Sequence, residues 1–239
     1  MIKRWADCPR QELTDCLPRG LVVLAIGAVE QHGPHLPTGT DALVVTSLVN
    51  RAAELAGDRC PGDVILAPEV AVGVSAHHVP FGGTLSLSPA TMLGLLGDLF
   101  DSIAAAGASR LLVVNGHGGN SGILRAAAGA AGARTRMKVA CLDYWALLPS
   151  SPTMPGHAGE FETALVLALM PDRVRDTPTR DQAPTYPAVR GAEVHTQEGW
   201  ATMDGFSDLP HRAGKEAGDG FFRDLADALA ETIVTAAAL

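Results

Sequence analysis

Two unbroken apolar runs each lead directly into a loop of glycine and histidine, and this coincidence limits the possible folds more than any other feature. Leu21–Ile26 (LVVLAI) precedes one loop, and Leu111–Val114 (LLVV) precedes the other. Continuous apolar runs of this length are typical of parallel-sheet strands buried on both faces. Because sites in such sheets lie at the carboxyl ends of the strands, we expect the two loops to meet at one edge.

Helices are predicted to alternate with these and other strands. Further strands are predicted at Val64–Leu66 and Val139–Leu142, with an additional edge strand at Thr84–Leu87. Capping residues and glycine or proline stops predict helices at Asp41–Ala56, Ser88–Ala106, from about Ser121, Ala158–Met170 and Lys215–Ala237, whereas residues 172–210 show no clear pattern. This alternation predicts an α/β fold with a mainly parallel sheet covered by helices on both faces.

Composition excludes several classes of protein. The chain has 239 residues and a net charge of −8, without the lysine and arginine clusters that nucleic-acid binding requires. It contains no run of about 18 apolar residues, so no membrane span is expected. The N-terminus lacks an apolar signal core, and the four scattered cysteines form no zinc or redox motif, so we expect a cytoplasmic protein.

The first loop, Gly27–Asp41 (GAVEQHGPHLPTGTD), carries candidate metal ligands. In an extended segment, residues two apart point the same way, so Glu30 and His32 can face one point beyond the strand. The glycines and prolines allow the chain to return, which brings Asp41 to them. Two carboxylates and an imidazole suit zinc, manganese or iron. The simpler interpretation is a solvated Glu-x-His pair followed by a helix N-cap at Asp41.

The second loop, Asn115–Asn120 (NGHGGN), also follows a buried strand and precedes a helix. His117 can coordinate a metal. The three glycines of the loop let a ligand approach the backbone closely. The bare amides of Gly118 and Gly119 could stabilise a developing oxyanion. Taken alone, the segment could also be an ordinary glycine-rich turn.

The third segment, Gly156–Thr163 (GHAGEFET), places His157 at a helix start and two glutamates in the first turn. Glu160 and Glu162 are two residues apart and cannot share one helix face, so at most one of them is a ligand. Either a site or a solvated helix start is compatible with this segment alone.

Five side chains form the candidate ligand set, two imidazoles and three carboxylates. Three negative charges against two divalent ions leave about one positive charge, which a bridging hydroxide would cancel. With two metals Asp41 is the natural bridge, whereas five ligands around one metal would exclude the water. The set predicted to hold the metals is Glu30, His32, Asp41, His117 and Glu162.

The three segments together resemble the creatininase family of metal-dependent amidohydrolases, from about Leu21 to Pro171, with weaker similarity at Gly205–Gly220. The resemblance implies a three-layer α/β/α sandwich, one domain over residues 1–239, two divalent metals per chain and a homo-oligomer, often a hexamer. Zinc is the first expectation, with manganese or iron as alternatives. Family members open the creatinine ring, deformylate an amide in flavin or deazaflavin synthesis, or trim the mycofactocin precursor peptide.

One departure from the family pattern concerns the second loop. Creatininase proper resembles NGHxEN there, with a metal-binding glutamate where this chain has Gly119. Glu162, which matches the glutamate of the family's HAGxxET segment, must then complete the site. His78 matches a family histidine on the substrate side, whereas His77 stands where glutamate is common. Creatinine therefore becomes doubtful, and the formamide- and peptide-cleaving branches are closer.

The sequence thus predicts hydrolysis of an amide, cyclic amide or formamide by a hydroxide that bridges two metals. His157 could protonate the leaving nitrogen, or it could be a structural histidine bonded to the backbone. His78, Gly118, Gly119 and Trp145 are predicted to contact the substrate, although a core position for Trp145 is also open. The rivals are a peptidase for a ribosomal precursor peptide and a non-catalytic metal-binding scaffold.

Overall fold

A parallel sheet forms the centre of the computed structural model, which describes residues 1–148, 156–185, 189–192 and 194–239. In the described part of the chain the sheet has five strands in the order β1-β3-β2-β4-β5, and every pair of neighbours is parallel. The strands are β1 (Ile2–Arg4), β2 (Leu21–Ile26), β3 (Val64–Leu66), β4 (Arg110–Asn115) and β5 (Lys138–Asp143). The predicted parallel sheet is confirmed.

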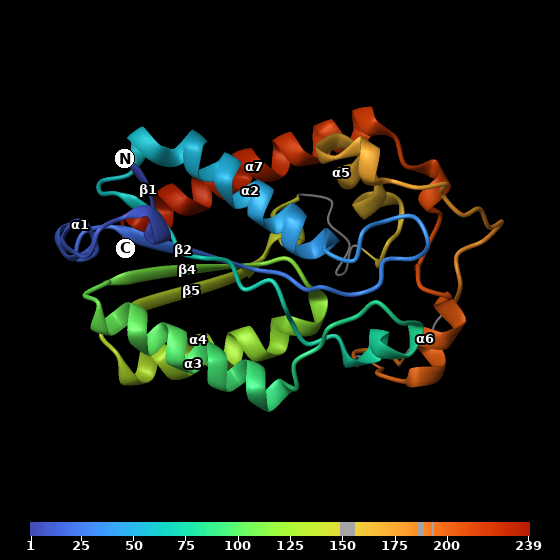
Figure 1. Cartoon of the computed structure of the whole chain (residues 1–239), viewed down its shortest axis with the longest axis horizontal. Coiled ribbons are helices and arrows are strands. Elements are labelled where there is room, and N and C mark those ends of the chain that lie inside the picture. The colour runs from blue at the N-terminus through green and yellow to red at the C-terminus, as the bar shows by residue number, and fades with distance from the viewer. Residues whose placement is uncertain (149–155, 186–188, 193) are drawn as a thin grey trace.

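Helices cover both faces of this sheet (Figure 1). One face carries α2 (Thr40–Ala56), α5 (Glu160–Leu169) and α7 (Lys215–Ala237), and the other carries α3 (Pro89–Ala105) and α4 (Ser121–Arg134). Two shorter helices are α1 (Arg10–Cys16) and α6 (Gln197–Met203). The three-layer α/β/α arrangement is therefore confirmed. Among the described residues, no helix combines the length and apolar composition needed to cross a bilayer.

Two hydrophobic clusters hold the layers together, and β2 contributes to both. Successive side chains of a strand point to opposite faces. Accordingly Leu21 and Val23 pack against α2 and α7, whereas Val22 and Leu24 pack against α3 and α4. All six residues of β2 are buried, as a strand covered on both faces requires.

The structure corrects some of the expected elements. Thr84–Leu87 is not a strand, because only Leu85 pairs, through one isolated bridge to Val29. The helix expected from Ala158 begins at Glu160, because Ala158 has a left-handed φ of 47°. The sequence did not predict β1, α1 or α6.

The strand register brings the two glycine- and histidine-containing loops together. Ile26, the last residue of β2, pairs with Asn115, the last residue of β4. The Gly116 amide then donates to the Ile26 carbonyl (2.8 Å), so the loops leave the sheet side by side. Both therefore lie at its carboxyl edge, as predicted.

Candidate metal centre

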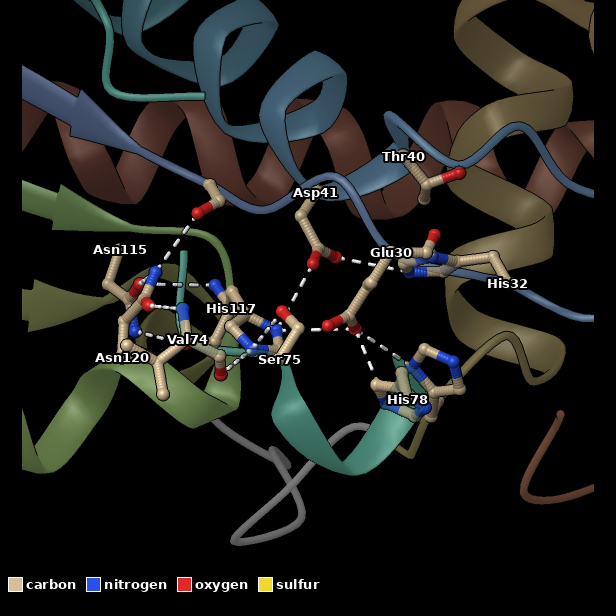
Figure 2. A network of polar contacts seen from close by, with 12 residues as sticks. Glu30, His32, Thr40, Asp41, Val74, Ser75, His78, Asn115, His117 and Asn120 are labelled. Atoms are coloured by element: carbon tan, nitrogen blue, oxygen red, sulfur yellow. Dashed lines mark hydrogen bonds and ion pairs between the residues drawn. The ribbon is translucent and has the colours of Figure 1, made fainter. Parts of the chain in front are cut away.

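The five predicted ligands converge beyond this edge of the sheet, and Figure 2 shows four of them, Glu30, His32, Asp41 and His117. Glu30 and His32 lie in the loop after β2, Asp41 in the first turn of α2, and His117 directly after β4. Glu162 lies in the first turn of α5, a helix on the same face of the sheet as α2. All five side chains are buried, with exposed fractions between 0% and 6%.

His32 faces two carboxylates. Its Nδ1 lies 3.0 Å from the Glu30 carbonyl oxygen, which can only accept, so Nδ1 carries the proton. Its Nε2 lies 3.2 Å from Asp41 Oδ1 and 3.7 Å from Glu162 Oε2. In a neutral imidazole Nε2 is an acceptor, as the carboxylate oxygens are. The lone pair of Nε2 therefore faces the lone pairs of these oxygens.

His117 shows the same arrangement on the other side of Asp41. Its Nε2 donates to the Val74 carbonyl (3.0 Å). Its Nδ1 lies 3.2 Å from Asp41 Oδ2 and 3.3 Å from Glu30 Oε1. Asp41 therefore presents one oxygen to each histidine.

A proton or a cation between each imidazole and its carboxylates would remove this opposition of lone pairs. Metal-binding histidines usually donate their other N–H to a carbonyl or carboxylate, as His32 and His117 do here. Glu30 Oε2 and Asp41 Oδ2 are buried and accept no hydrogen bond within the described part of the chain. The residues thus fit two cations, one beside His32 and one beside His117, with Asp41 between them.

The charges of this cluster shift the pKa values of its members. Burial disfavours the charged imidazole of His32, but the carboxylates of Asp41, Glu162 and Glu30 together outweigh burial and raise the pKa of His32 to about 10. Burial also opposes ionisation of Asp41, yet the charges of His32 and His117 lower its pKa. For Glu162 burial dominates and raises the pKa to about 7. The cluster therefore favours positive charge, which metal binding supplies while releasing protons.

The start of α5 explains why Glu162 rather than Glu160 enters the site. Glu162 Oε2 accepts a hydrogen bond from the Ala158 amide (2.6 Å), and the left-handed conformation of Ala158 accompanies this contact. Glu160 is exposed, and its amide donates to Asp208 Oδ1 (2.7 Å). The two glutamates therefore lie on different faces, as the sequence predicted.

His157 lies beside the cluster, and its two nitrogens have different environments. Nε2 lies 2.8 Å from the Gln31 carbonyl oxygen, whereas Nδ1 lies 3.4 Å from Glu30 Oε1. Burial and then the positive charge of His32 hold the pKa of His157 well below its usual value. The backbone bond expected of a structural histidine is present, but Nδ1 still faces the candidate ligands.

His78 lies in the short 3-10 helix Ala76–Phe81, with Nε2 at 3.5 Å from Glu30 Oε1. Gln31 Nε2 donates to His78 Nδ1 (2.9 Å) and lies 3.0 Å from His157 Nε2. Sequence reasoning missed Gln31, because alternation in an extended segment points it away from Glu30 and His32. Contact of His78 with substrate stays a prediction.

Gly118 and Gly119 follow His117 in the short 3-10 helix Gly118–Asn120, which leads directly into α4. A Cβ atom at Gly119 would overlap the Val74 carbonyl oxygen and lie 2.5 Å from His117 Nε2. The glycine therefore permits the hydrogen bond that orients His117, and this loop has no room for a glutamate. Contact of these glycines with substrate stays a prediction.

The structure places Trp145 in the hydrophobic core, against Tyr144 at a ring distance of 5.3 Å. Half-buried Trp200 of α6 contacts the cluster instead, with ring distances of 4.4 Å to His77 and 4.7 Å to His78. Trp200 belongs to the segment in which the sequence showed no pattern, so no signal identified it.

Comparisons with known proteins show which family the sequence and fold belong to. The family model described as "Creatininase: Creatinine amidohydrolase" matches residues 6–233. The mycofactocin precursor peptide peptidase of Mycolicibacterium smegmatis is 37% identical over 161 residues, which cover 64% of this chain and 60% of that relative's length. The creatinine amidohydrolase of Pseudomonas putida is 31% identical over 197 residues, or 72% of each chain.

Solved structures give the same result. One described as "Creatininase Mn" superposes with a TM-score of 0.80, covers 98% of both chains and is 26% identical in sequence. Another, described as a Zn-Zn type of a creatininase mutant, also has a TM-score of 0.80, with 26% identity and 96% of both chains covered. The chain therefore belongs to the creatininase family of metal-dependent amidohydrolases, as the three sequence motifs predicted.

Proposed function

We propose that this chain hydrolyses a carbon–nitrogen bond of an amide, cyclic amide or formamide with two divalent metal ions. One observation carries the proposal. His32 and His117 each donate one N–H to a backbone carbonyl and direct the other nitrogen at Asp41, from opposite sides. Two imidazoles that share one carboxylate in this way favour a pair of cations over a single cation.

The residues divide between two metal positions. His32, Asp41 and Glu162 would hold one ion, and Glu30, His117 and Asp41 would hold the other. Zinc is our first choice, with manganese or iron as alternatives, because imidazole and carboxylate ligands suit all three. When bound, such ions supply Lewis acidity, which activates water as a nucleophile and polarises a carbonyl group.

Other residues would handle the substrate. His157 Nδ1, which faces Glu30, can take a proton from the attacking water and pass it to the leaving nitrogen, while the bond of Nε2 to the Gln31 carbonyl keeps the ring oriented. His78 Nε2–H can donate to the substrate, because Gln31 occupies Nδ1 as its donor. The Gly118 and Gly119 amides can hold the developing oxyanion at the start of α4.

A second candidate function is cleavage of a ribosomally made precursor peptide. The 37% identity to a mycofactocin precursor peptide peptidase favours it, as does the steric exclusion of a glutamate at Gly119. A peptide bond and a cyclic amide require the same attack on a carbonyl carbon, so both candidates use the same centre.

We further propose a single domain over residues 1–239 and a homo-oligomer in the cytoplasm, with the hexamer that the family resemblance implies as its assembly. Support for a reducing compartment comes from Cys8, Cys16, Cys60 and Cys141, all of which are free thiols.

The test combines metal content with turnover. Protein purified without chelator should contain about two divalent ions per chain, and a panel of formamides, creatinine and end-blocked peptides should include a substrate. Chelation should abolish turnover, and added metal should restore it. Two bound metals without turnover on any amide would favour the non-catalytic scaffold, and one metal per fully active chain would exclude the two-metal site.

A further inference from the structure

His77 is a half-buried histidine beside the candidate metal centre, outside the five proposed ligands. It precedes His78 in the short 3-10 helix Ala76–Phe81. One nitrogen of His77, one nitrogen of His117 and one carboxylate oxygen of Glu30 all lie within 4.8 Å of one another. Because Glu30 and His117 are proposed to hold the same ion, His77 approaches that metal position and not the one beside His32.

Aromatic contacts orient the His77 ring. Its centroid lies 4.4 Å from the ring of Trp200 and 4.2 Å from the ring of His78. The rings of His77 and His117 are nearly parallel, with 7° between their planes and 6.1 Å between their centroids. Within the described part of the chain, neither ring nitrogen of His77 has a hydrogen-bond partner. Packing therefore positions the ring and leaves a nitrogen lone pair for a cation.

The two metal positions would otherwise be alike. His32 and Glu162 belong to one, His117 and Glu30 belong to the other, and Asp41 is shared. Each position thus has one imidazole and two carboxylates. A second imidazole beside His117 would make that position different, because imidazole suits zinc, whereas carboxylates suit manganese. Two imidazoles and two carboxylates also supply the four ligands of a tetrahedral zinc site.

We propose that His77 is a further metal ligand, which makes the ion beside His117 the more tightly bound of the two and the more selective for zinc. The inference rests on the two-metal centre of the proposed function and deepens it. It also gives α6 a part in metal binding, because Trp200 of that helix packs against the His77 ring.

His77→Phe is the direct test. The substitution removes both ring nitrogens but keeps an aromatic ring against Trp200 and His78. Competition with a chromophoric chelator measures the affinity for the first zinc ion. That affinity should fall by about tenfold or more, since even residues that only orient metal ligands contribute about 10–100-fold. His211→Phe, the same change at an exposed histidine of the 3-10 helix Pro210–Arg212, is the matched control and should bind zinc normally.

X-ray absorption at the zinc edge gives a readout that a packing role would not move. With one equivalent of zinc, imidazole scattering from the unmodified protein should correspond to about two histidines per ion, and His77→Phe should reduce it to about one. The measurement on the unmodified protein decides the question even if the variant does not fold.

One imidazole per zinc in the unmodified protein would overturn the inference. An unchanged first affinity in His77→Phe would do the same, as would an equal loss in His211→Phe. The two proposals fail separately. A two-imidazole zinc site without hydrolysis of any amide would reject only the proposed function. Hydrolysis by the two-metal protein, with one imidazole on the first zinc ion, would reject only the role of His77.

Discussion

Asp41→Asn tests the shared carboxylate most directly. The substitution keeps the side-chain shape but replaces one carboxylate oxygen with an NH2 group. Each oxygen of Asp41 now lies 3.2 Å from an imidazole nitrogen, so the new amide would face either His32 or His117. Because the amide can donate to the imidazole lone pair, it satisfies that histidine without a cation.

The expected loss is large because both charge and a ligand atom disappear. Changes to residues that only orient metal ligands cost about 10–100-fold in affinity, so a direct ligand should cost at least about 100-fold. A factor of 100 corresponds to about 2.7 kcal/mol of binding free energy. We expect Asp41→Asn to retain at most one tightly bound ion per chain and to lose turnover by at least the same factor.

Chelator competition followed by elemental analysis measures this change. Asp98→Asn, at an exposed position of α3, is the matched control and should bind both ions normally. If Asp41→Asn bound two ions with affinities within about threefold of the unmodified protein, Asp41 could not be a shared ligand. The geometric argument for two metal positions would then be wrong.

Four other predictions follow from the same contacts. Glu162→Gln should leave about one ion per chain by elemental analysis, because Glu162 faces His32 and not His117 among the ligand histidines, whereas exposed Glu160→Gln should keep both. His157→Ala should keep its metals and lose turnover by about two to four orders of magnitude; lost metal would instead make it a ligand. In chelated protein the raised pKa of His32, about 10, contributes stability that is complete below the unfolded pKa of 6.5 and is lost as pH rises toward 10. The melting temperature of chelated protein should therefore fall over that range more than that of metal-loaded protein, and a rise would contradict us. Gly119→Ala should destabilise the fold by about 1–3 kcal/mol in denaturant titrations and weaken metal binding, because the methyl group displaces His117 or Val74; an unchanged midpoint would refute the steric argument.

The sequence predicted those strands and helices that have a clear local pattern, either a continuous apolar run or a capping residue. Continuous apolar runs identified β2 and β3 with the observed bounds, and Ser88, which accepts from the Thr91 amide, marked the start of α3. The predicted ligands converge because β2 and β4 pair in register and both end at the same edge. In these segments the structure that the local sequence pattern favours is also the one that the packed fold requires.

Other elements depend on contacts that no local pattern reveals. β1 has only three residues and exists through its pairing with β3 at the edge of the sheet. α6 has seven residues, and it lies against the short helix Ala76–Phe81 (Figure 1). Its Trp200 reaches the site through that packing, whereas Trp145, which the sequence analysis named as a substrate contact with a core position also open, packs into the core. Sequence reasoning therefore identified the residues that converge at the candidate metal centre, but it missed Trp200.

The third motif shows why a ligand loop can depend on residues far outside it. Ala158 adopts a left-handed conformation, which costs roughly 1–2 kcal/mol for a residue other than glycine. Ser207 offsets this cost by exchanging two hydrogen bonds with the His157 backbone, both 2.7 Å long. The strained turn directs the Ala158 amide at Glu162 and leaves His157 beside Glu30. The segment that follows α6 thus fixes both the proposed proton donor and a proposed ligand, although it supplies no metal-binding side chain itself.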